Sequence, residues 1–171
     1  KRAIDKASGQ NNDNFEEITY EGYGPKGIAV IIECLTDNKN RTVSDLRHAL
    51  TKHGGSLGTN GSVSHLFRKV GVMKLLNITE DDLLEHMDVV EIEDFEMIDT
   101  DCIIFTKPNE LFSTKKYFES KTIEVIDEEI IMDALTTIQI SKDDEEKVSD
   151  LSSKIEELDD VQNVYMNASL S

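Results

Sequence analysis

Runs of apolar residues divide the first half of the chain into strands, a helix and glycine-rich turns. ITYE (18–21) and IAVIIECLT (28–36) are rich in β-branched and aromatic residues and are separated by glycines, which is typical of strands joined by a turn. Because the second run is almost continuously apolar, we expect a central strand. Apolar residues then recur at helical spacing from about 42 to 53, and this predicted helix ends at the glycine pair that follows.

The second half alternates between strand and helix patterns. Ser141 and Thr79 are expected to cap helices, because a hydroxyl can accept a bond from the first free backbone N–H groups. At the end of the chain, the pattern predicts a last helix, about 142–158, and a closing strand, 161–166. The predicted strands and helices between 70 and 133 are, in order, VGVMKLL, TEDDLLEHM, VVEIEDF, DCIIFTK, PNELFSTKKYFES and TIEVI. This β-α-β-β-α-β order is the ferredoxin-like arrangement.

Charge is distributed unevenly over the 171 residues. The net charge is −17, but residues 1–75 hold 11 basic and 8 acidic residues, whereas residues 76–171 hold 7 and 27. A basic first part and an acidic second part suggest two faces with different partners, although acidic residues that serve solubility alone would give the same pattern. No run of about 18 apolar residues is present, so we expect no membrane span.

Several catalytic and cofactor patterns are absent or incomplete. Residues 22–27 spell GYGPKG, which matches GxGxxG, but a strand pattern follows where a dinucleotide site needs a helix. A hairpin turn is the better interpretation. Cys34 and Cys102 form no CxxC pair and are expected to be buried thiols. His48 and His53 lack a third zinc ligand, and the Asp-rich stretches near 143 and 159 lack an EF-hand pattern. We therefore expect no enzyme activity, no metal and no cofactor.

A glycine-rich loop at 54–62, GGSLGTNGS, is the strongest candidate for a binding site. Glycines can let neighbouring backbone N–H groups converge on an anion, and basic residues flank this loop in sequence, which would suit a phosphate of RNA or DNA. An ordinary long loop would look the same, with Ser62 capping a short helix in VSHLFRK. The expected nucleic-acid surface comprises Lys26, Lys39, Arg41, Arg47, Lys52, Gly54, Gly55, Gly58, Gly61, Ser62, Arg68 and Lys69.

Four ordered motifs resemble one protein family. YEGYGPKG, ECLTDNKNRT and GGSLGTNGSV within residues 18–72, and DDVQNVYMN near the end, closely resemble the YebC/PmpR family, which includes a mitochondrial translational activator of cytochrome c oxidase subunit I. The resemblance covers nearly the whole chain. One departure is LLEHMDVVEIE, which stands where the family has a small, Ala/Gly-rich helix end.

The resemblance implies an α+β fold with an inserted ferredoxin-like domain. Residues 1–14 would be the tail of an N-terminal helical domain and a linker, so that the chain as given would begin inside a longer protein. Residues 15–69 with 134–171 would form domain II, and 70–133 the inserted domain III.

The resemblance also implies a regulator of gene expression. We expect a ribosome-associated translation factor that contacts rRNA or tRNA, because an RNA surface needs no base-reading motif. The alternative is a transcriptional regulator that binds duplex DNA, although no helix-turn-helix or zinc finger is recognisable. A protein-interaction or small-molecule module is a third possibility, since the fold hosts many functions; no small-molecule substrate and no membrane are expected. The location would be cytoplasmic in a bacterium and the mitochondrial matrix in a eukaryote.

Overall fold

The computed structural model describes residues 14–169, which form two compact units. Of these, residues 14–68 and 134–169 belong to the first unit, and residues 69–133 to the second. Each unit has an antiparallel four-stranded sheet and two α-helices, so the expected α+β class is confirmed. The predicted helix tail in KRAIDKA lies outside the described residues.

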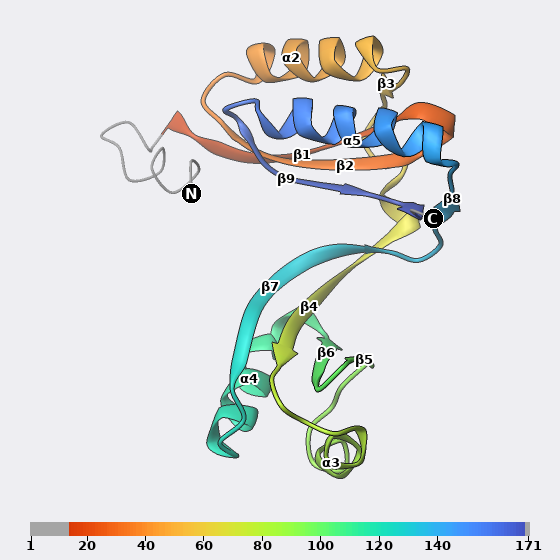
Figure 1. Ribbon diagram of the computed structural model, residues 1–171. Helices are drawn as coiled ribbons and strands as arrows, with labels where there is room; N and C mark the ends of the chain where they lie inside the picture. The colour runs from red at the N-terminus through yellow and green to blue at the C-terminus, as the bar shows by residue number, and fades with distance from the viewer. Residues whose placement is uncertain (1–13, 170–171) are drawn as a thin grey trace. The chain divides into compact units, whose positions relative to one another are not determined.

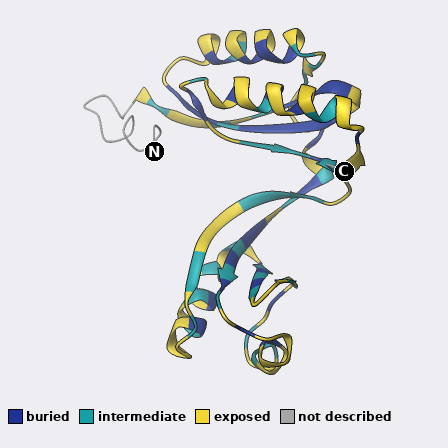
Figure 2. Ribbon diagram, viewed as in Figure 1, coloured by how far each residue is buried: buried dark blue, intermediate teal, exposed yellow. Residues whose placement is uncertain are grey.

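In the first unit, two helices cover one face of a sheet with the strand order β3-β1-β2-β9 (Figure 1). Outward-facing parts of both helices are exposed, and the strand β2 beneath them is buried, whereas much of β1 and β9 is exposed or half-buried (Figure 2). The strands and helices are β1 (Glu16–Tyr23), β2 (Ala29–Thr36), α2 (Lys39–Lys52), β3 (Ser56–Leu57), α5 (Lys142–Glu156) and β9 (Val161–Met166), with the short pair β8 (Ile138–Gln139) and β10 (Ala168–Ser169). The 3₁₀ turns are η2 (Pro25–Gly27) and η3 (Ser64–Leu66).

β2 is the central strand, as its apolar run predicts. It is bonded on one side to β1 and on the other to β9, and Ile32 lies between Tyr20 and Val164. Its alternate side chains point at the helices, where they join the core that holds Leu46 of α2 and Leu151 of α5. The two helical stripes are therefore buried against one strand.

The start of α2 differs from the predicted position near 42. The side chain of Asn38 accepts a bond from the backbone N–H of Arg41, so the helix begins three residues earlier, at Lys39. By contrast, α5 begins where its pattern predicts, because Ser141 accepts from the N–H of Asp144.

The hairpin turn predicted for 22–27 is confirmed: η2 joins the antiparallel strands β1 and β2. Gly27 supplies a positive φ of 76°, and Lys26 adopts a similar φ of 64°. Gly22 is needed for a different reason, since a Cβ there would lie 2.7 Å from the carbonyl oxygen of Ser56.

The second unit has the strand order β5-β6-β4-β7, and its elements follow the predicted β-α-β-β-α-β sequence. They are β4 (Phe67–Leu75), α3 (Glu80–His86), β5 (Asp94–Ile98), β6 (Asp101–Thr106), η4 (Pro108–Glu110), α4 (Leu111–Ser120) and β7 (Val125–Ala134). Thr79 caps α3 as expected, by accepting from the N–H of Asp82. β7 is much longer than the predicted TIEVI strand.

The helix predicted in VSHLFRK is wrong. Only the one-turn η3 forms there, and its N-cap residue Val63 makes no side-chain bond. The chain then enters β4 at Phe67, which is buried together with Val70. The three apolar residues of this stretch, Val63, Leu66 and Phe67, also fit a helical spacing, and the burial of Phe67 in β4 decided the outcome.

Both cysteines are buried, as predicted. Burial raises the pKa of the Cys102 thiol to about 11, so this group is neutral near pH 7. No helix among the described residues has the length and apolar character needed to cross a membrane.

Candidate nucleic-acid interface

The glycine-rich loop is held by an internal carboxylate. Glu21 of β1 is only 5% exposed, and it accepts bonds from the backbone N–H groups of Gly61 (2.7 Å), Val63 (2.9 Å) and Ser64 (2.7 Å). Burial by itself would raise the pKa of Glu21, but these three donors outweigh it, and the pKa is lowered. Backbone N–H groups thus converge on an anion, as expected of an anion site, but this anion is the carboxylate of Glu21 in the protein itself.

The other glycine amides of the loop are also used internally. The N–H of Gly54 donates to Thr51, that of Gly55 to Leu50, and that of Gly58 to the carbonyl oxygen of Glu21. The expectation that these N–H groups point outward to a phosphate is therefore wrong. Gly55 and Gly58 are required for close packing, since a Cβ on Gly55 would lie 2.0 Å from the carbonyl oxygen of Tyr23, whereas Gly54 supplies a positive φ of 82° and meets no close neighbour.

Ser62 does not cap a helix. Its hydroxyl is buried and has no hydrogen-bond partner within the described part of the chain. A Cβ on Gly58 would lie 2.6 Å from that oxygen, so the two residues are in close contact.

Arg41 is engaged by carboxylates. Its guanidinium donates from Nε (3.1 Å) and Nη2 (2.8 Å) to Asp160 and from Nη2 to Asp37 (2.9 Å). Hydrogen bonds to Asp160, and then to Asp37, raise the pKa of Arg41. Asp160 is 4% exposed and also accepts from the hydroxyl of Thr42 (2.8 Å), so it is a buried structural group.

Acidic residues surround Arg41. The hollow of about 470 Å³ beside it is lined by Phe15, Asp37, Arg41, Asp45, Glu157, Leu158, Asp159 and Asp160. Phosphate would be repelled here, and Lys39 nearby is paired with Glu16 (3.4 Å). Lys39 and Arg41, two of the predicted binding residues, are therefore engaged in ion pairs within the protein at the start of α2.

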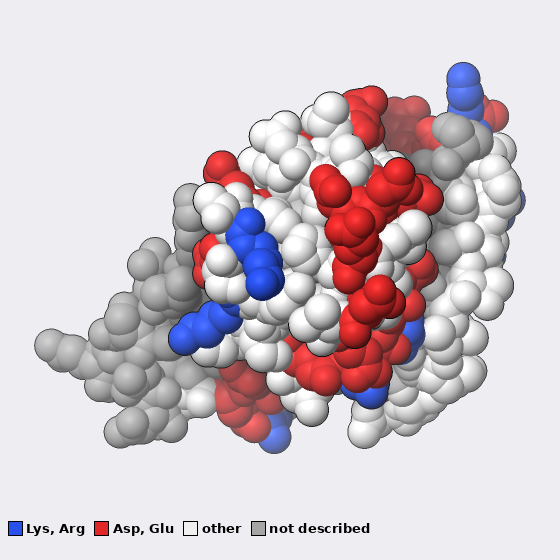
Figure 3. All heavy atoms as spheres, turned by 90° about the horizontal axis from the view of Figure 1, so that it is seen from below, with Lys and Arg blue, Asp and Glu red and all other residues white. Residues whose placement is uncertain are grey.

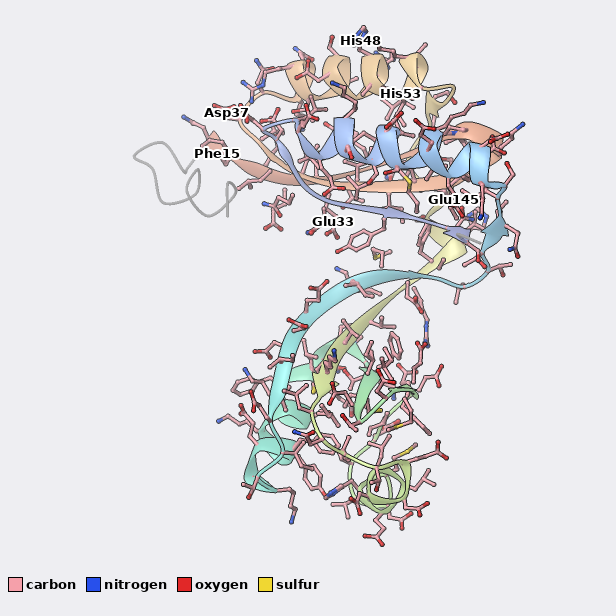
Figure 4. All side chains as sticks on the ribbon, in the orientation of Figure 1. Phe15, Glu33, Asp37, His48, His53 and Glu145 are labelled. Atoms are coloured by element: carbon pink, nitrogen blue, oxygen red, sulfur yellow. The ribbon has the colours of Figure 1, made fainter. Side chains whose placement is uncertain are left out.

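The later half of α2 presents free basic groups. Arg47 and Lys52 are exposed, and among the described residues neither has an ion-pair partner. His48 and His53 lie on the same half of the helix, opposite the end that carries Asp37 (Figure 4). His48 and Lys52 are four residues apart, so they occupy one face of α2.

A groove of about 420 Å³ runs between this half of α2 and α5. Its lining combines His48 and Lys52 of α2 and the following His53 with Lys154 of α5, and it includes one carboxylate, Asp45. Lys154 is paired with the exposed Glu157 (3.9 Å), so Lys52 is the cation of the lining without an ion pair among the described residues. Nδ1 of His53 lies 2.9 Å from the carbonyl oxygen of Ala49, so Nδ1 carries a hydrogen and donates to that oxygen. Because a helix C-terminus carries a partial negative charge, attraction for phosphate comes from the side chains alone.

The remaining predicted residues do not join this groove. Lys26 lies in the η2 turn, and Arg68 and Lys69 lie on β4 at the boundary of the two units. Lys154 was not among the predicted residues, and no local pattern could have indicated it. It contributes only because α5 packs beside α2.

Comparisons with known proteins give a consistent result. Residues 15–168 match the family model described as the TACO1/YebC second and third domain. A protein of Pseudomonas putida named probable transcriptional regulatory protein is 41% identical over 173 residues, which is 99% of this chain and 70% of the relative. A protein with the same descriptive name from Thermoanaerobacter pseudethanolicus is 43% identical over 174 residues, covering 99% of this chain and 71% of the relative.

A solved structure shows the same fold. The crystal structure of the conserved hypothetical protein Aq1575 from Aquifex aeolicus superposes with a TM-score of 0.80 at 40% identity. The match covers 92% of this chain and 66% of that one. This chain therefore spans about two thirds of the length of that relative.

Proposed function

Because this chain belongs to the TACO1/YebC family, we propose that it is a non-enzymatic regulator of gene expression that binds nucleic acid through the groove between α2 and α5. The observation that carries the proposal is the pair of free cations on the later half of α2. Lys52 lines the groove with two imidazoles and Lys154, and Arg47 lies on the same half of the helix outside the groove lining. Nothing in this arrangement resembles an activated nucleophile or an acid–base pair. Its chemistry is the binding of phosphates.

The expected target is the RNA of the ribosome. Affinity for a nucleic-acid backbone comes mainly from neutralised phosphates, which side chains on a helix surface can supply. Folded RNA is recognised largely by shape and backbone, so a groove without base-reading residues is sufficient. Duplex DNA is the second candidate, and the names of the bacterial relatives favour it.

The test compares two double variants with equal changes in charge. Arg47→Glu/Lys52→Glu, the groove variant, removes the two free cations of the later half of α2, one of which lines the groove. Lys142→Glu/Lys147→Glu makes the same change in charge on α5 outside the groove lining. Sedimentation with ribosomes and retention of a DNA duplex are measured over a salt series. Binding to ribosomes should fall with salt, and the groove variant should reduce the slope of log K against log salt by about 1 to 2.

Each outcome has a definite meaning. Ribosome binding that only the groove variant weakens supports the proposal. Binding to duplex DNA alone, with the same dependence on the groove, selects the transcriptional alternative. Equal effects of the two variants, or no binding to either nucleic acid at low salt, overturn the proposed site.

A further inference from the structure

The second unit carries a groove of its own at one end of its sheet. It has a volume of about 550 Å³ and lies between the connection from β4 to α3 and the turn from β5 to β6. The residues that line it are Asn77, Ile78, Thr79, Glu80, Met97, Asp99 and Thr100.

Hydrogen bonds hold the two walls of this groove together. The N–H of Ile78 donates to the carbonyl oxygen of Thr100 (2.9 Å), and the N–H of Asn77 donates to the Asp101 carboxylate (3.0 Å). Asn77 and Asp99 adopt left-handed φ values of 54° and 55°, which Asn and Asp tolerate better than most residues. The shape of the groove is therefore fixed by hydrogen bonds between its walls and by the backbone conformation of these two residues.

Apolar side chains contribute to the groove, and carboxylates stand on its rim. Ile78 belongs to the core of the second unit and the half-buried Met97 packs against that core, while the exposed Glu80 and Asp99 line the two opposite walls. Leu84 is 44% exposed and follows Glu80 by four residues, so it extends the apolar surface along the same face of α3. A ligand that fits must offer an apolar group with positive charge on both sides of it.

The surrounding surface is strongly acidic. Residues 75–106 contain 11 Asp and Glu residues and no Lys or Arg. The bordering Lys74 and Lys107 are engaged with Asp101 (3.8 Å) and Glu91 (3.3 Å). Figure 3 shows carboxylates gathered in a continuous band on one face, with few basic side chains beside them. Nucleic acid would be repelled by this surface.

We propose that this groove, together with Leu84, is a docking surface for a protein segment in which Lys and Arg flank one large apolar side chain. Charge complementarity selects such a partner, and the apolar surface gives it a fixed position. The proposal does not depend on nucleic-acid binding, because the surface lies on the other unit. It also assigns a role to the LLEHMDVVEIE stretch, which contains Leu84.

The test measures fluorescence anisotropy of a short labelled peptide in which lysines and arginines flank one leucine. Glu80→Lys/Asp99→Asn alters the rim, and Asn is chosen because it tolerates the left-handed φ. Asp150→Lys/Glu156→Gln makes the same change in charge on α5 and serves as the control. The rim variant should weaken binding roughly tenfold, and the control much less.

The apolar contact is tested separately. Leu84→Ser should weaken binding of the leucine peptide but not of a peptide with glycine in place of the leucine. Circular dichroism establishes that each variant is folded. Equal binding of the two peptides, or equal effects of the rim and control variants, would overturn the proposal.

Discussion

Arg41 and Asp160, 119 positions apart in the chain, form a two-bond ion pair that ties the start of α2 to the segment before β9. Thr42 adds a third bond to the same carboxylate, and its hydroxyl lies 2.8 Å from that of Thr36 at the end of β2. One buried acidic group thus connects a helix, the central strand and the last strand. Such a network favours a single arrangement of these elements when each of its members is satisfied.

Asp160→Ala should destabilise the protein by about 2–3 kcal/mol, somewhat less than for a fully buried pair because the Arg41 side chain is 45% exposed. Asp37→Ala is the control, since Asp37 is an exposed partner of the same guanidinium, and it should cost less than about 0.5 kcal/mol. Urea unfolding followed by circular dichroism measures both. Equal effects of the two substitutions on the free energy of unfolding would show that the buried bonds to Asp160 stabilise the protein no more than the exposed bond to Asp37.

Glu21→Gln should destabilise the protein by about 2 kcal/mol at pH 7, because the amide loses the charge that three N–H donors share and turns a donor toward one of them. The folded pKa of Glu21 lies below its ordinary value of 4.5, so its contribution is complete above that pH and is lost as pH falls through the folded pKa. The difference in stability between wild type and variant should therefore shrink in acid. Glu17→Gln, an exposed neighbour on β1, should have little effect. A difference that stays constant from neutral to acidic pH would contradict this account.

Gly55→Ala should destabilise the protein by about 3 kcal/mol, because the added Cβ would meet the Tyr23 carbonyl oxygen at 2.0 Å. Gly54→Ala meets open space and bears only the strain of a φ of +82°, which costs about 1 kcal/mol. Thermal unfolding of the two variants gives the comparison. If the loop serves architecture, Gly54→Ala should leave nucleic-acid affinity unchanged. A selective loss of affinity in this variant would restore the loop as a binding element.

Cys34 and Cys102 should resist iodoacetamide in the native protein at pH 8, since both are buried and the Cys102 pKa is about 11. Both should react fully in guanidinium chloride. Intact-mass spectrometry counts the modified thiols in each condition. Rapid labelling of either thiol in the native state would show that the core around it opens.

The sequence by itself determined the α+β class, the central place of β2, the order of elements in the second unit and the caps of α3 and α5. These features follow from the spacing of apolar residues and from hydroxyl groups that lie three positions before the backbone N–H groups from which they accept bonds. Both can be read from a short stretch of sequence. The family resemblance rests on motifs of the same local kind.

Only the tertiary structure decided which groups on the surface are free to bind. Glu21 accepts a bond from the N–H of Gly61, which is 40 positions away, and Asp160 binds Arg41, which is 119 positions away. No local sequence pattern indicates either pairing. Lys154 joins Lys52 only because two helices pack on the same sheet. A basic residue in sequence is a candidate ligand, but its charge is available only if folding brings no carboxylate to it, and that is set by contacts between distant segments.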